Sequence, residues 1–236
     1  MKISVEQTPK QILSDYVLDH VDAVSIVHLP GRRLSDTVRT ITAIKKKNKK
    51  VKVIPHIAAR SLKNQNELFT NCDRFRDLGI NDVLLIGGST TSGNCYSSAF
   101  TVYNDIKEKD YKFKTICGVY PQKEKFSDVE NKKYSKFSRG ITQVCLNHRL
   151  LNQFDNKTIV GVPSNCSASD LFKFIKICGI GRTLKEAIPN LVGAKYISFA
   201  GFSTCKFVQD LSGDRDIHVF NFGNIENTIK SLQKLL

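Results

Sequence analysis

The chain has 236 residues, which suits one β/α barrel or two small domains, and its 41% hydrophobic residues can form a core without disulfides or a structural metal. No stretch approaches the ~20 apolar residues that span a membrane, and the N-terminus lacks the apolar core of a signal peptide, so we expect a soluble cytoplasmic protein. The net charge of +14 is consistent with binding to nucleic acid, with binding to ligands that carry phosphates or several carboxylates, or with a lysine-rich surface that has no partner. Binding to nucleic acid is disfavoured because the known DNA- and RNA-binding motifs are absent.

Short β-rich runs follow one another from end to end of the chain. Each is apolar almost throughout rather than alternating, which is typical of parallel strands covered by helices. The eight runs are residues 2–6, 23–27, 52–57, 82–88, 113–119, 140–146, 158–164 and 217–222.

The stretches between these runs carry apolar residues at helical spacing. The stripes are Leu34, Val38, Ile41 and Ile44; Leu68, Cys72, Phe75 and Leu78; Leu171, Phe174, Ile175 and Cys178; and Ile225, Ile229, Leu232 and Leu236. Helix starts are indicated by Asn64 with Glu67 and by Ser167 with Asp170, which resemble capping boxes. Gly79 and Gly179 stand where helices are expected to end.

Eight strands, each followed by a helix, predict a single (βα)8 TIM-type barrel that forms one domain over residues 1–236. An open doubly wound sheet is the alternative. Residues 196–202 have strand propensity but exceed the strand count, so we interpret residues 190–211 as the helix before the last strand.

Ligands of β/α barrels bind at the carboxyl ends of the strands, which gives a test for every candidate site residue. The polar residues and glycines at these ends are Glu6, His28, His56, Gly87, Gly88, Ser89, Tyr120, Gln143, Asn165, Asn221 and Gly223.

The seven cysteines are odd in number and contain no CxxC pair. Several stand inside apolar runs, such as Cys117 and Cys145, so buried free thiols in a reducing compartment are expected. No Cys and His residues have ligand spacing, and we expect no metal site.

Several strand ends, in chain order, carry motifs of one known family. ISVEQTP contains a Glu at the end of the first strand, VIPHIAAR contains Pro55-His56 on the third, and VYPQ and RGITQ end the fifth and the sixth. Residues 79–89 align without a gap to the pattern Gly-Ile-x-x-Ile-x-Ala-Leu-Arg-Gly-Asp. Over nearly its whole length the chain resembles the methylenetetrahydrofolate reductase family.

The resemblance implies roles for these residues. Glu6 corresponds to the general acid that protonates folate N10 or N5, and Gln143 corresponds to the residue that holds the pterin ring. The implied reaction is hydride transfer between NADH or NADPH and 5,10-methylene- or 5-methyl-tetrahydrofolate through FAD. The family is commonly oligomeric, so a homo-oligomer is expected, although the sequence has no self-association motif. The implied FAD contacts are His56, Gly87, Gly88, Ser89, Tyr120, Lys132 and Lys133.

The chain also departs from the family pattern. Arg-Gly-Asp is replaced by Gly87-Gly88-Ser89, the segment after Tyr120 is shorter, and the His that usually follows it is Glu124. These departures motivate a second hypothesis, a flavin-free folate-binding barrel that serves a methyl-transfer partner. A third, a polyanion-binding protein, depends only on the charge.

Each candidate has a structural interpretation as well. Glu6 suits a salt bridge, His56 a core histidine bonded to backbone, and Tyr120 a packing residue. The pair Lys132-Lys133 suits a solvated helix face, and we favour a structural role for His28.

Overall fold

A computed structural model describes residues 1–29, 34–88, 95–121, 135–177, 196–198 and 201–236. The predictions for Ser89, Lys132, Lys133, Cys178 and Gly179 lie outside these ranges, and so does Glu124.

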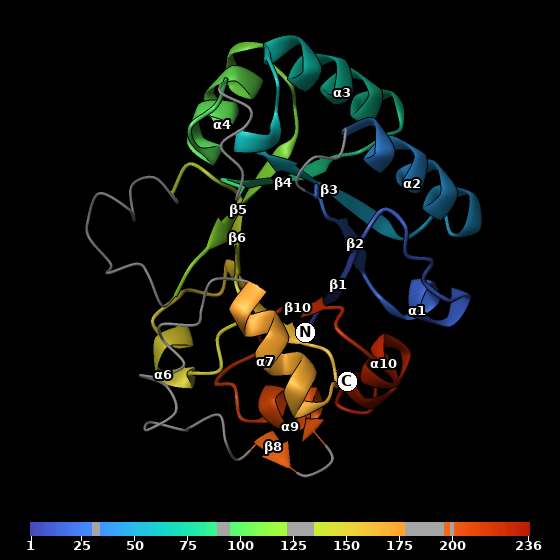
Figure 1. Cartoon of the computed structure of the whole chain (residues 1–236), viewed down its shortest axis with the longest axis vertical. Coiled ribbons are helices and arrows are strands. Elements are labelled where there is room, and N and C mark those ends of the chain that lie inside the picture. The colour runs from blue at the N-terminus through green and yellow to red at the C-terminus, as the bar shows by residue number, and fades with distance from the viewer. Residues whose placement is uncertain (30–33, 89–94, 122–134, 178–195, 199–200) are drawn as a thin grey trace. The chain divides into compact units, whose positions relative to one another are not determined.

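Eight parallel strands close into a barrel in the order β1-β10-β7-β6-β5-β4-β3-β2 (Figure 1). The barrel prediction is therefore confirmed and the open sheet is wrong. Every barrel strand coincides with one of the apolar runs, because strands covered by helices are apolar on both faces. The strands are β1 (Ile3–Gln7), β2 (Ala23–Ile26), β3 (Lys52–Ala58), β4 (Asp82–Ile86), β5 (Lys114–Val119), β6 (Arg139–Thr142), β7 (Thr158–Pro163) and β10 (Ile217–Phe220).

The helices follow the predicted stripes. In α2, Leu34, Ile41 and Ile44 are buried, and in α3 Leu68, Cys72 and Phe75 are buried. The helices are α1 (Asp15–His20), α2 (Leu34–Lys47), η1 (Ala59–Ser61), α3 (Gln65–Asp77), α4 (Ala99–Glu108), α6 (His148–Leu151), α7 (Ala168–Ile177), α9 (Thr204–Gln209) and α10 (Ile225–Leu232).

The helix α3 begins and ends as its sequence predicts. The Asn64 side chain accepts a hydrogen bond from the Glu67 N–H, and the Glu67 carboxylate accepts one from the Lys63 N–H. Gly79 follows the helix with a φ of +66°, a conformation that favours glycine.

The interpretation of residues 190–211 as one helix is wrong where the structure describes them. Two short antiparallel strands, β8 (Ile197–Ser198) and β9 (Gly201–Phe202), precede the six-residue helix α9. Gly201 has a φ of +106°, and a Cβ there would lie 2.3 Å from the Cys166 carbonyl oxygen, so a helix does not fit at this point. The strand propensity of this segment is therefore satisfied in a separate two-stranded sheet.

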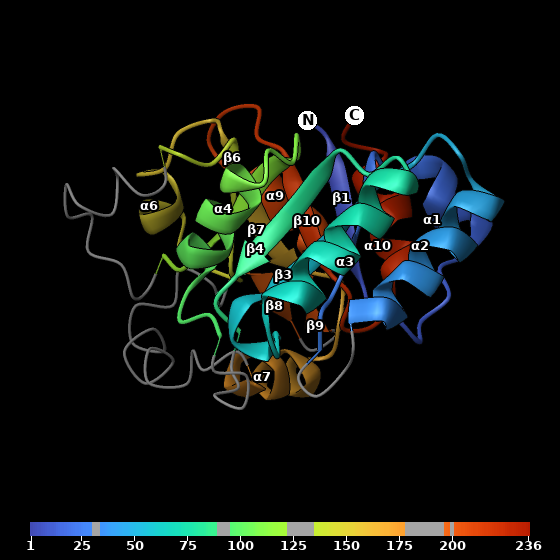
Figure 2. The same cartoon turned by 90° about the horizontal axis from the view of Figure 1, so that it is seen from above.

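Contacts divide the chain into two compact units. Unit 1 comprises Met1–Val5, Val119–Lys125 and Ile141–Leu236, and unit 2 comprises Glu6–Gly118 and Phe126–Gly140. The single domain over residues 1–236 stays a prediction. Within unit 2, helices α2 and α3 lie along the outer side of the strands (Figure 2), and Ile41, Phe75 and Leu85 are fully buried.

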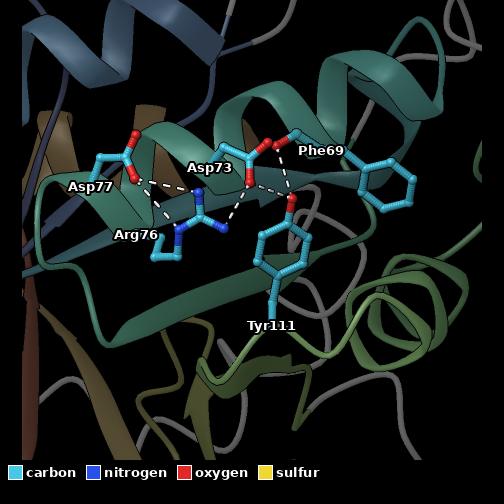
Figure 3. A network of polar contacts seen from close by, with 5 residues as sticks. All are labelled: Phe69, Asp73, Arg76, Asp77 and Tyr111. Atoms are coloured by element: carbon cyan, nitrogen blue, oxygen red, sulfur yellow. Dashed lines mark hydrogen bonds and ion pairs between the residues drawn. The ribbon is translucent and has the colours of Figure 1, made fainter.

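A polar network ties α3 to the segment before β5 (Figure 3). The Tyr111 hydroxyl donates to the Asp73 carboxylate at 2.9 Å, and Arg76 pairs with Asp73 at 3.1 Å and with Asp77 at 3.4 Å. Burial, together with the hydrogen bond to Asp73, raises the pKa of Tyr111 to about 12.

Candidate functional site

Glu6 stands near the carboxyl end of β1, as the sequence predicts. Its side chain is partly buried, and no hydrogen bond or ion pair joins it to the part of the chain that the structure describes. Desolvation by burial raises the pKa of this carboxyl to about 7. A group with that pKa can hold a proton near neutral pH and release it to a bound ligand.

Gln7 is a further candidate for the site that the sequence analysis missed. Its side chain is buried, and its Nε2 donates to the Gln11 carbonyl at 2.6 Å. The Gln7 Oε1 atom has no hydrogen-bond partner within the described ranges. The Gln7 carbonyl accepts the Val27 N–H at 2.9 Å, which joins the ends of β1 and β2. The signal available in the sequence was the position of Gln7, a polar residue directly after the candidate acid Glu6.

His56 is buried on β3 beside Ser25, which the sequence analysis did not identify. The Ser25 hydroxyl lies 2.6 Å from His56 Nε2 and donates to the Ile54 carbonyl at 3.3 Å. When the hydroxyl donates to Ile54, it accepts the Nε2 proton of His56, so one hydroxyl serves both groups. This arrangement fits the structural interpretation of His56, and the FAD contact stays a prediction.

His28 is also buried, and its Nδ1 accepts the Ala58 N–H at 3.2 Å. The Nδ1 atom of His28 therefore serves the backbone of β3 as a hydrogen-bond acceptor. It links the end of β2 to the end of β3, which agrees with the structural role favoured from the sequence.

The two glycines after β4 differ in what surrounds them. Gly88 has a φ of +77°, and a Cβ there would lie 3.2 Å from the Ala58 Cβ. At Gly87 the space of a side chain is taken by Arg60, whose Nη2 would lie 3.0 Å from a Cβ. The backbone N–H and the Nε of Arg60 both donate to the Gly87 carbonyl, at 3.0 Å and 3.1 Å. Arg60 therefore brings an exposed cation to the ends of β3 and β4, and the sequence analysis missed it.

Unit 1 holds the remaining candidates that the structure describes. Tyr120 and Gln143 are partly buried, and the Gln143 N–H donates to the Val119 carbonyl at 2.7 Å, which joins the ends of β5 and β6. Asn165 is used by the fold itself, since its Oδ1 accepts the Thr204 N–H at 2.9 Å. The Asn221 Nδ2 atom is buried without a partner in the described structure.

A second serine–histidine pair lies in unit 1. The Ser4 hydroxyl lies 2.9 Å from His218 Nδ1 and donates to the Ile217 carbonyl at 3.2 Å, as Ser25 does beside His56. His218 is fully buried, and desolvation lowers its pKa to about 4. It is therefore neutral at physiological pH.

The residues of the described ranges bear on metal binding and on membrane insertion. These residues contain no group of three or more His, Cys, Asp or Glu side chains that suits a metal ion. Within the same ranges no helix has both the length and the hydropathy needed to cross a bilayer. None of the six cysteines that the structure describes forms a disulfide, and Cys72, Cys117 and Cys145 are buried.

No protein-family model matches the chain, and no curated protein matches it either. Solved structures are similar. An uncharacterized protein from Clostridium thermocellum that binds two copies of 5-methyl-5,6,7,8-tetrahydrofolic acid is 14% identical, with a TM-score of 0.63 over 99% of this chain and 94% of that chain. The 2,3-dimethylmalate lyase, of the PEP mutase/isocitrate lyase superfamily, is 7% identical with a TM-score of 0.56 over 99% and 79%. A protein from Aquifex aeolicus VF5 is 11% identical with a TM-score of 0.54 over 100% and 92%.

Proposed function

We propose that this chain binds a reduced folate and transfers a hydride between a nicotinamide and 5,10-methylene- or 5-methyl-tetrahydrofolate, in the manner of a methylenetetrahydrofolate reductase. The observation that carries the proposal is the partly buried Glu6 carboxyl at the end of β1, whose pKa is about 7. The ordered motifs at the strand ends support it. So does similarity, over nearly the full length of both chains, to a barrel that binds 5-methyl-tetrahydrofolate.

Glu6 supplies the proton in this proposal. Reduction of the methylene compound consumes one hydride and one proton, and the nicotinamide is oxidised. Protonation of N10 breaks its bond to the methylene carbon, which leaves an iminium at N5 that accepts the hydride and becomes the methyl group. A carboxyl that stays protonated near neutral pH is suited to that first step, and an ordinary surface carboxylate is not.

Gln143 is the residue we propose for the pterin ring. Its amide both donates and accepts hydrogen bonds, so it can pair with an amide-like ring edge in two places. The side chain is partly buried at the end of β6, which leaves part of its surface accessible.

FAD is the proposed carrier of the hydride between the nicotinamide and the folate. The described residues fit it in part. Arg60 provides a cation suited to a pyrophosphate, and Tyr120 is partly exposed at the end of β5. His56 and Gly88 are the further residues that would contact FAD, although both are also explained by contacts within the chain.

A flavin-free folate-binding barrel is the second candidate. It is favoured by Gly87, where a guanidinium fills the space next to the backbone that a flavin was expected to approach. In this alternative the bound 5-methyl-tetrahydrofolate is presented to a methyl-transfer partner, and Glu6 protonates N5 to make the methyl group a better electrophile.

The test compares the wild-type protein with Glu6→Gln and with the control Glu108→Gln, which removes an exposed carboxylate of the same unit. The absorption spectrum is recorded after FAD is added and the excess is removed. NADH or NADPH and then 5,10-methylene-tetrahydrofolate follow under anaerobic conditions. Retained flavin, with turnover lost only in Glu6→Gln, supports the oxidoreductase.

Two other outcomes are decisive. Calorimetric binding of 5-methyl-tetrahydrofolate by a colourless protein without turnover supports the second candidate. A protein that binds neither FAD nor folate contradicts both.

A further inference from the structure

We propose that the Arg60 guanidinium binds an oxyanion of the ligand at the carboxyl ends of β3 and β4. The inference rests on the proposed function for the identity of that ligand. Arg60 lies in η1, directly after β3, and Gly87 directly follows β4. The two strands are parallel neighbours whose last paired residues are Ala58 and Ile86, so both residues stand at the same edge of the sheet.

The position of the guanidinium is fixed by backbone. The Arg60 N–H and the Arg60 Nε both donate to the single Gly87 carbonyl oxygen, at 3.0 Å and 3.1 Å. The Nη2 atom then lies where residue 87 would carry its side chain, 3.0 Å from a Cβ built there. Glycine at position 87 thus leaves the space for this placement, since a Cβ there would push the guanidinium away by a few tenths of an ångström.

The charge of Arg60 is not neutralised by an acidic side chain of the described structure. Two other exposed arginines of unit 2 differ, since Arg76 pairs with Asp73 and Asp77, and Arg39 lies 3.9 Å from Asp36. The next acidic residue along the chain, Glu67, accepts the Lys63 N–H at 2.9 Å as part of the start of α3.

A guanidinium held through Nε keeps the N–H groups of its two Nη atoms, which lie in one plane, for a further acceptor. This geometry suits the two oxygens of a carboxylate or a phosphate better than a lysine ammonium does. Arg60 is exposed, so a ligand can reach it without a rearrangement of the barrel.

Two parts of the proposed ligands carry this chemistry. The glutamate moiety of a folate has carboxylates, and FAD and the nicotinamides have phosphates. The Arg60 guanidinium suits a carboxylate and a phosphate equally. Binding experiments with ligands that lack one or the other distinguish the two.

Two variants and one control test the inference by calorimetry. Arg60→Gln removes the charge, and Gly87→Ala keeps the charge but places a methyl group against Nη2. Arg39→Gln removes an exposed arginine on the outer helix α2 as the control. The probes are 5-methyl-tetrahydrofolate against 6-methyl-tetrahydropterin, which lacks the glutamate, FAD against riboflavin, and inorganic pyrophosphate.

We expect Arg60→Gln to weaken binding by roughly tenfold or more, which is the usual effect of losing a charge-assisted hydrogen bond. Gly87→Ala should weaken it several-fold and Arg39→Gln should leave it unchanged. An effect on the folate but not on the tetrahydropterin assigns the carboxylate, and an effect on FAD but not on riboflavin assigns the phosphate.

The inference fails if Arg60→Gln and Gly87→Ala bind every probe as the wild type does, or if the wild type binds none of them. It survives the failure of the proposed function in one case. If neither folate nor FAD binds but pyrophosphate binds and depends on Arg60, the oxyanion site stands and the ligand is another anion.

Discussion

The Ser25 Oγ atom lies 2.6 Å from Nε2 of His56, although 31 residues separate the two in the chain. The parallel register of β2 and β3 places Ser25 opposite Ile54, and the same hydroxyl donates to the Ile54 carbonyl. A single serine thus satisfies one nitrogen of a buried histidine and one strand carbonyl. Ser4 repeats the arrangement with His218 and Ile217 in unit 1.

Ser25→Ala is expected to lower the free energy of unfolding by about 1–3 kcal/mol, because it leaves the His56 Nε2 atom buried without its hydroxyl partner. Urea unfolding at pH 7 measures the change. The control is Ser97→Ala at an exposed position, which should stay within about 0.5 kcal/mol of the wild type. Equal midpoints for both variants would show that the Ser25–His56 contact adds nothing to stability.

Glu6→Gln is expected to make the protein more stable than the wild type as pH rises. The carboxyl has an ordinary pKa of 4.5 and a folded pKa of about 7, so the folded state holds a proton that the unfolded state has lost between these values. Glu6 therefore lowers the free energy of unfolding by roughly 3 kcal/mol as pH rises from 4.5 to 7, and the glutamine variant lacks this contribution. Denaturant unfolding of both proteins at pH 5 and pH 8 measures the difference, and Glu108→Gln, which removes an exposed carboxylate, should give no such trend.

His218→Gln is expected to show the opposite trend. The imidazole has an ordinary pKa of 6.5 and a folded pKa of about 4, so the unfolded state takes up a proton first as pH falls. His218 therefore lowers the free energy of unfolding by roughly 3 kcal/mol as pH falls from 6.5 to 4, and the variant lacks this contribution. The exposed His20→Gln serves as the control. A His218 C2-proton resonance that titrates near pH 6.5 in the folded protein would contradict the assignment.

These two groups act in opposite directions over largely the same pH range. Glu6 costs stability as pH rises above 4.5, and His218 costs stability as pH falls below 6.5. Their contributions to the pH dependence of the wild type therefore largely cancel, and each becomes visible only when the other is substituted.

Tyr111→Phe is expected to lower the free energy of unfolding by about 1 kcal/mol at pH 7, because it removes the hydrogen bond to Asp73 shown in Figure 3. The folded pKa of about 12 exceeds the ordinary value of 10, so the wild type also loses stability as pH rises through this range, and the variant does not. Tyrosinate absorbance at alkaline pH follows the group directly. Tyr103→Phe, whose ring packs against Phe100, is the matched control and should leave the alkaline absorbance change of Tyr111 in place.

The sequence by itself determined the barrel and the extents of most of its elements. Apolar runs and helical stripes are local properties. Strands covered by helices are apolar almost throughout, and helices that face a core carry apolar residues at helical spacing. The same holds for Gly79 at the end of α3, where only the local backbone conformation matters. Glu6 was also identified at this level, since the end of the first strand is a position that the pattern defines.

Only the tertiary structure decided which residues meet. Arg60 reaches the Gly87 carbonyl across 27 residues, and Ser4 reaches His218 across 214, through strand neighbours that no local period encodes. The error over residues 190–211 has the same origin, because β9 pairs with β8 and contacts the Cys166 carbonyl outside the barrel. Strand propensity indicates that a segment will pair, but the partner is set by the register and closure of the whole fold.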